Sequence, residues 1–100
     1  MTVGAQKRHV FEAVVGAVTV HVMERAQRSA ATRLGIVVDR SAGGAVVRNA
    51  IKRRIREAFR ACSARPGNDI VVRGDGSVRA TSYQELVMHL KGALTRAGAL

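Results

Sequence analysis

Apolar residues recur at helical spacing within the most basic stretch of the chain, residues 45–60. At about 100° per residue they fall on one arc of about 120°, and the members of this arc are Val47, Ile51, Ile55, Ala58, Phe59 and Cys62. The opposite arc is polar and positively charged, and it holds Arg48, Asn49, Lys52, Arg53, Arg56 and Arg60. Only Arg54 departs from this basic arc. The pattern predicts a helix with one face in the core and a basic face in solvent.

Alternating apolar and polar residues predict a half-buried strand over residues 17–23. One of its faces carries Val18, Val20 and Val22, and the other carries Thr19, His21 and Met23. A continuous apolar run bounded by charge predicts a more fully buried strand over residues 33–39, and a similar run predicts a third strand over residues 69–73. A turn at Gly43 and Gly44 separates the second strand from the basic helix.

Helices are expected at both ends of the chain. The first ten or so residues lead into Val10 and Phe11 and are interpreted as one short helix. A capping box formed by Ser82 and Glu85 begins a last helix. Its inward residues are Leu86, Leu90, Ala93 and Leu94, with Gly98 as the stop. The elements predict a single domain over residues 1–100, with an α+β or split α/β sandwich fold.

Charge points to a polyanionic partner. The chain has a formal net charge of +10 and only 3% aromatic residues, so contact with phosphates should dominate over base stacking. Like charges at (i, i+4) on the basic helix repel one another, and partner phosphates would relieve this repulsion. The alternative is a solvated face in a chain whose composition favours arginine, although composition alone would scatter arginines around the helix.

Catalytic chemistry by the chain itself is not predicted. Cys62 is the only cysteine, so an intramolecular disulfide and a thiolate zinc site are excluded. Asp39, Asp69 and Asp75 are isolated acids, and no constellation for a metal or a catalytic site emerges. The apolar segment 13–23 is far shorter than the roughly 20 residues of a membrane span. We therefore expect a cytoplasmic protein with no membrane partner.

Several motifs resemble those of the protein subunit of bacterial ribonuclease P. They are Arg33-Leu-Gly-Ile-Val-Val38, Gly43, Ala45-Val-Val-Arg-Asn-x-x-Lys-Arg-Arg-x-Arg-Glu-Ala-Phe-Arg60, Asp69-Ile-Val-Val72 and Ser82-Tyr-x-Glu-Leu86. The resemblance implies a two-layer α/β sandwich with the order α-β-β-β-α-β-α. It also implies a left-handed βαβ crossover that carries the basic helix, which general rules would not predict because such crossovers are right-handed in about 98% of cases. The order matches the predicted elements if one more short strand lies between residues 24 and 32, or if the strands are counted differently.

The resemblance also implies the site residues. The family's RNA-binding signature matches Arg48, Asn49, Lys52, Arg53 and Arg56, with Arg54 and Arg60 as basic neighbours and Arg40 in the preceding loop. The family's cleft for the single-stranded 5′ leader of precursor tRNA would be lined here by Phe11, Thr19 and His21. Ala50 stands where the family usually has another arginine. Asp39, Ser41 and Gly44 make the loop less basic than usual, and His21 replaces a frequent tyrosine.

The implied function is assistance to a catalytic RNA that removes the 5′ leader of precursor tRNA. The RNA subunit would hold Mg²⁺ and perform the hydrolysis, and the protein would contribute electrostatic neutralisation and leader positioning. A structural RNA-binding module, either ribosome-associated or specific for double-stranded RNA, is the main alternative. DNA binding is disfavoured because the basic helix offers few Gln, Asn or Ser side chains for base edges. The sequence does not decide the oligomeric state.

Overall fold

Four strands form one mixed sheet in the computed structural model, which describes residues 10–24 and 32–100. The strands are β1 (Val10–Val15), β2 (Val18–Glu24), β3 (Arg33–Val38) and β4 (Asn68–Gly74). Their order across the sheet is β1-β2-β4-β3. The β1–β2 and β2–β4 pairs are antiparallel, whereas β3 and β4 are parallel.

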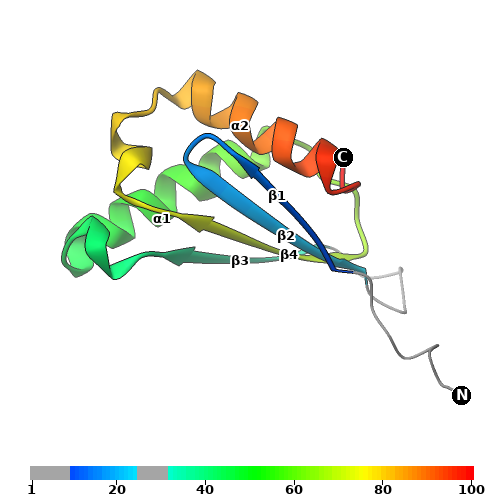
Figure 1. Cartoon of the computed structure of the whole chain (residues 1–100), viewed down its shortest axis with the longest axis horizontal. Helices are drawn as coiled ribbons and strands as arrows, with labels where there is room; N and C mark the ends of the chain where they lie inside the picture. The colour runs from blue at the N-terminus through cyan, green and yellow to red at the C-terminus, as the bar shows by residue number, and fades with distance from the viewer. Residues whose placement is uncertain (1–9, 25–31) are drawn as a thin grey trace, which may run out of the picture.

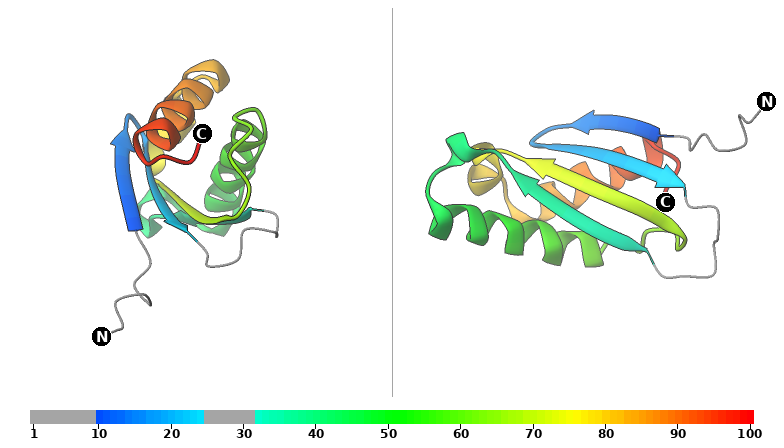
Figure 2. Two further views of the ribbon diagram at one scale, coloured as in Figure 1. Left: turned by 90° about the vertical axis from the view of Figure 1, so that its right-hand side faces the viewer. Right: turned by 90° about the horizontal axis from the view of Figure 1, so that it is seen from below.

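Two helices, α1 (Ala45–Arg60) and α2 (Tyr83–Arg96), cover one face of this sheet (Figure 1). Short 3-10 helices, η2 (Arg40–Ala42) and η3 (Gly76–Ala80), precede them. The predicted capping box of α2 is confirmed, because the Ser82 hydroxyl accepts from the Glu85 amide at 3.1 Å and the Glu85 carboxylate accepts from the Ser82 amide at 3.2 Å. The opposite face of the sheet carries neither helix (Figure 2).

The core lies between the sheet and the two helices. The predicted alternation in β2 is confirmed, since Val18, Val20 and Val22 are at most 1% exposed and face the helices. They pack with Ile70 and Val72 of β4 in the same buried cluster. The helices contribute fully buried side chains at helical spacing, which are Ile51, Ile55, Ala58, Leu86, Leu90, Ala93 and Leu94.

The expected α+β class is confirmed, and the order of the described elements is roughly consistent with the expected one, with one correction at the N-terminal side. Val10 and Phe11 are not helical but begin β1, which forms a hairpin with β2 through a turn at Gly16, where φ is +57°. Pairing with β2 satisfies the backbone groups of β1, and the valines and the phenylalanine of this segment favour a strand. β1 is therefore the additional strand that the expected order requires. The segment 25–31, where that strand was expected, lies outside the described residues. Residues 1–9, the rest of the predicted first helix, also lie outside them.

The β3-α1-β4 connection joins neighbouring parallel strands. Taken together, the views in Figures 1 and 2 show that α1 crosses from β3 to β4 in the left-handed sense. This is the unusual hand that the family resemblance implied. As a consequence, α1 lies beside β3 at the edge of the sheet, while α2 covers β1 and β2 (Figure 2).

Candidate nucleic-acid interface

The basic face of α1 is presented to solvent by a rigid helix. Ile51, Ile55 and Ala58 are fully buried. On the far side of the helix, the exposed residues are Asn49, Arg53, Arg56 and Arg60, and Lys52 is half-buried. The predicted division into an apolar stripe and a basic face is therefore confirmed, whereas contact of these residues with RNA stays a prediction. A dense row of cations on a packed helix can hold several phosphates without rearrangement of the backbone.

Arg48 occupies the border between the buried stripe and the basic face. Its side chain is half-buried, and its Nε atom is buried without a hydrogen-bond partner in the described part of the protein. An unsatisfied buried donor costs about 1–3 kcal/mol. Because Nε is buried, a phosphate of a partner molecule would have to bind the other guanidinium nitrogens and would leave Nε without an acceptor. Contact of Arg48 with RNA stays a prediction.

Arg54 has a different role from the one predicted. Its guanidinium donates hydrogen bonds to the carbonyl oxygens of Val78 at 2.7 Å, Arg79 at 3.2 Å and Thr81 at 2.5 Å. Arg54 lies about 160° around the helix from Lys52. It therefore braces α1 against η3 and the start of α2, and is directed away from the basic face. Contact of Arg54 with RNA stays a prediction, but in this geometry its guanidinium is occupied by backbone carbonyls. Its departure from the basic arc was the signal in the sequence.

Further cations gather at the N-terminal end of α1. Arg40 is exposed in η2, which directly follows β3. η2 packs against η3, where Arg79 is also exposed. The Asp39 amide fixes this loop by donating to the Gly74 carbonyl at 3.1 Å. Arg79 was missed by the sequence reasoning, because only the fold brings η3 beside η2 and the start of α1.

The face of the sheet that no element of residues 10–24 and 32–100 covers, called the uncovered face, carries Thr19 and His21, two of the residues predicted for the leader cleft. His21 pairs with Glu12 across β1 and β2, with its Nε2 atom 3.5 Å from the carboxylate. Thr19 lies opposite Arg73 of β4 in the register of the sheet. Both side chains are half-buried and reachable from solvent. The strand prediction therefore placed these two residues on the correct face.

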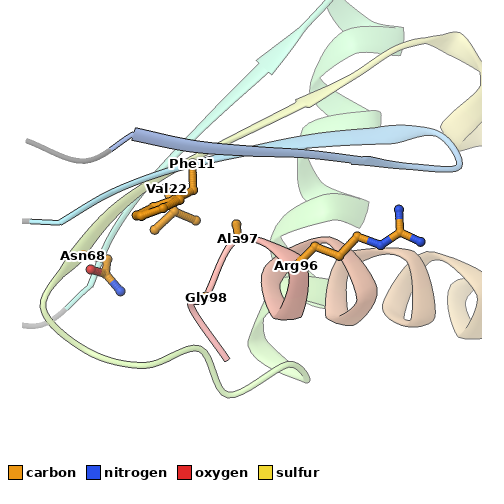
Figure 3. Close-up of a pocket in the computed structure, with 6 residues that line it drawn as sticks. All are labelled: Phe11, Val22, Asn68, Arg96, Ala97 and Gly98. Carbon is orange, nitrogen blue, oxygen red and sulfur yellow. The ribbon is translucent and has the colours of Figure 1, made fainter.

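Phe11, the third residue predicted for this cleft, lies on the other face of the sheet. It lines a pocket of about 190 Å³ next to Val22 of the core, at the C-terminal end of α2 (Figure 3). The remaining lining residues are Asn68, Arg96, Ala97 and Gly98. Because side chains alternate along a strand, Phe11 shares its face with Ala13 and not with Glu12, the neighbour of His21. The structure therefore does not bring Phe11 together with Thr19 and His21.

Ionisable groups outside the basic helix mostly serve the fold. Burial raises the pKa of the Cys62 thiol, whose sulfur lies 3.4 Å from the Ala58 carbonyl oxygen, in keeping with its predicted place in the core. Hydrogen bonds from the hydroxyl and amide of Ser77 lower the pKa of Asp75, the N-cap of η3. Over residues 10–24 and 32–100, no three His, Cys, Asp or Glu side chains stand together as a metal site would require. No helix in these ranges has the length and apolar character needed to cross a membrane.

The fold and the charge arrangement define a small basic α+β domain that is suited to a polyanionic partner. Comparison with known proteins identifies the family. A family model described as Ribonuclease P matches residues 4–98, and the chain therefore belongs to the ribonuclease P protein family. The resemblance first seen in the motifs is confirmed.

Individual relatives agree with this assignment. The ribonuclease P protein component of Salinispora tropica is 40% identical over 75 residues, covering 73% of this chain and 55% of that protein. The component of Thermus scotoductus is 41% identical over 68 residues, covering 68% of this chain and 41% of that protein. The chain thus spans about half the length, or less, of these curated relatives.

Solved structures share the fold. The RNase P protein from Staphylococcus aureus superposes with a TM-score of 0.73 at 28% identity, covering 95% of this chain and 85% of that one. The RNase P protein from Thermotoga maritima superposes with a TM-score of 0.71 at 27% identity, covering 84% of this chain and 80% of that one. The left-handed crossover and the exposed basic helix thus occur within a fold already known for this family.

Proposed function

We propose that this chain is the protein component of a ribonuclease P holoenzyme, in which it binds the catalytic RNA through the basic face of α1. The observation that carries the proposal is the basic face itself, held outward by the fully buried residues Ile51, Ile55 and Ala58. Membership of the ribonuclease P family supports the choice of this RNA over other polyanions. Arg40 and Arg48 extend the surface toward the N-terminal end of the helix.

In this proposal the RNA subunit performs catalysis, and Mg²⁺ held by that RNA would supply the activation of water for hydrolysis at the 5′ end of the mature tRNA. No catalytic residue is assigned to the protein, and its described residues form no group suited to hold the ion. The protein contributes positive charge, which lowers the repulsion between two RNA molecules that must approach each other. It also holds the 5′ leader against the uncovered face of the sheet, at Thr19 and His21.

A reconstitution assay tests the proposal. The double variant Lys52→Ala/Arg53→Ala should weaken binding to ribonuclease P RNA and reduce the log-log salt slope by nearly one unit per lost phosphate contact. The matched control is Lys91→Ala/Arg96→Ala, which removes one lysine and one arginine from exposed positions of α2 and should leave binding nearly unchanged. Equal behaviour of the two double variants, with native circular dichroism, would contradict the assignment of this face.

Leader binding is tested with precursor and mature tRNA. His21→Ala should reduce the affinity of the holoenzyme for precursor tRNA and hardly affect mature tRNA, which has no leader. Phe11→Ala serves as the comparison, because Phe11 lies on the helix side of the sheet beside Val22 and should not discriminate between the two substrates. Loss of the same size for both substrates in the His21 variant would exclude a leader contact.

The alternative of a structural RNA-binding module makes a different prediction for the same preparations. A ribosome-associated or double-stranded RNA-binding protein would bind duplex RNA as tightly as ribonuclease P RNA. It would not lower the Mg²⁺ concentration needed for cleavage of precursor tRNA by the RNA subunit. The cleavage assay at limiting Mg²⁺, with and without the protein, separates the two functions.

A further inference from the structure

The uncovered sheet face is an ordered grid of side chains whose rows follow from the strand register. One row consists of Glu12, His21, Val71 and Gly35 across β1, β2, β4 and β3. The next row consists of Val14, Thr19, Arg73 and Val37. Since neighbouring strands lie about 5 Å apart, each side chain contacts solvent next to its neighbours in the same row.

Arg33 and His21, which lie on this same face, each stand beside a carboxylate. Arg33 of β3 makes a bidentate pair with Asp69 of β4, with distances of 2.9 and 3.2 Å. This pairing raises the pKa of Arg33. His21 stands 3.5 Å from the carboxylate of Glu12. Neither Arg33 nor His21 therefore adds an unpaired positive charge to this face.

Arg73 is the exception. It is exposed near the centre of the sheet, and its row neighbours Thr19 and Val37 carry no charge. Within the described ranges no ion pair involves Arg73. Asp69, four residues earlier on β4, is bound to Arg33. Two acids lie nearer along the strands: Asp75, two residues beyond Arg73, accepts from the Ser77 amide, and Asp39 lies two residues beyond Val37. Neither is paired with Arg73, which therefore supplies an unpaired positive charge to this face.

Apolar side chains surround this charge. Val14 is 59% exposed, Val37 is 40% exposed and Val71 is 38% exposed, and all three point to the uncovered side. A surface that combines one free guanidinium with exposed apolar groups suits a single nucleic-acid strand. Such a strand offers a phosphate to the cation and turns its sugars and unpaired bases toward the valines.

We propose that Arg73 binds a backbone phosphate of the single-stranded leader of precursor tRNA, with the Thr19 hydroxyl as a second donor from the neighbouring strand. Val37 and Val71 contact the adjacent sugar or base. The inference rests on the proposed function and adds to it a specific anchor for the leader. Neither the basic motif nor the predicted cleft residues pointed to Arg73.

The test uses reconstituted holoenzyme and a titration of precursor and mature tRNA over a range of salt concentrations. Arg73→Ala should weaken precursor binding by about two- to tenfold and reduce its log-log salt slope by about 0.7, the value for one phosphate contact on a single strand. Binding of mature tRNA should not change. Arg73→Lys retains the charge and should retain most of the slope.

Arg96→Ala is the matched control, because it removes one exposed arginine from α2 on the helix side of the sheet. Replacement of Arg73 leaves the buried neighbours Ile70 and Val72 in place, and circular dichroism should stay native. Unchanged precursor affinity and slope, or equal loss for mature tRNA, would overturn the inference. A loss of assembly with ribonuclease P RNA would also overturn it, since it would assign Arg73 to the other RNA.

Different results would refute the proposed function and the leader anchor. If Lys52→Ala/Arg53→Ala weakens RNA binding while Arg73→Ala has no effect on the precursor, the proposed function stands and the anchor is wrong. If the Lys52/Arg53 variant binds the catalytic RNA normally, the proposed function itself is wrong. A protein partner on the sheet face would show as an effect of Arg73→Ala that is independent of leader length, and that result would also overturn the anchor.

Discussion

Replacing Arg54 with alanine should destabilise the protein without removing a contact with RNA. The guanidinium of Arg54 donates to the carbonyls of Val78, Arg79 and Thr81 over 2.5 to 3.2 Å. Hydrogen bonds from a charged donor each contribute about 1.5–3 kcal/mol. The three bonds share one side chain, and water replaces part of them after truncation, so their contributions do not add. We expect the free energy of unfolding to fall by about 2–4 kcal/mol.

Urea unfolding followed by circular dichroism measures this change, with a lower midpoint at an unchanged m-value. In a 100-residue domain the same loss corresponds to a decrease in Tm of at least about 8 °C. The neighbouring variant Arg53→Ala is the matched control, because Arg53 is exposed and should change stability by no more than about 0.5 kcal/mol. Arg54→Lys keeps the charge but not the planar fork, and should recover only part of the stability.

RNA binding provides the opposite readout for the same pair. Arg53→Ala should reduce the salt slope of binding to the RNA partner, and Arg54→Ala should leave this slope unchanged at temperatures where the variant is folded. If Arg54→Ala has the urea midpoint of the wild type and reduces the salt slope of RNA binding, the structural role of Arg54 is wrong. The original assignment of Arg54 to the RNA-binding surface would then be correct.

Two further predictions concern the turn at Gly16 and the N-cap at Asp75. Gly16→Ala should lower the free energy of unfolding by about 1–3 kcal/mol, because φ at this residue is +57° and an added Cβ atom would lie 2.4 Å from the ring of His89. Gly35→Ala is the control in the same urea assay. It should be nearly neutral, because its Cβ atom would meet only the Val71 side chain, at 3.7 Å. For Asp75, the pKa is lowered by Ser77, so its contribution to stability is present above the unfolded-state pKa and is lost as pH falls through the lowered value. Urea midpoints measured from pH 6 down to pH 2 should therefore show a wild-type advantage over Asp75→Asn that shrinks in acid, and a constant difference would contradict the capping role.

The sequence by itself determined the elements whose signal is local. Helical spacing of Ile51, Ile55 and Ala58 identified α1 and its two faces, because a helix in a small domain must bury its apolar stripe. Alternation identified β2, and the Ser82–Glu85 pair identified the start of α2. These features depend on residues within a few positions of one another, so periodicity and capping rules were sufficient for them.

The tertiary structure decided everything that depends on pairing between distant segments. β1 is a strand because β2 supplies its hydrogen bonds, and this pairing turns Phe11 to the helix side, away from His21. Arg54 has a structural role because the fold places two carbonyl groups of η3 and the carbonyl group of Thr81 within reach of its guanidinium. In the part of the chain that the structure describes, the guanidinium of Arg73 has no ion-pair partner because the sheet register places it beside Thr19 and Val37, while Asp69 is bound to Arg33. Such assignments require the partner strand or loop to be known, since a side chain's charge balance and exposure are set by neighbours that the linear sequence does not place beside it.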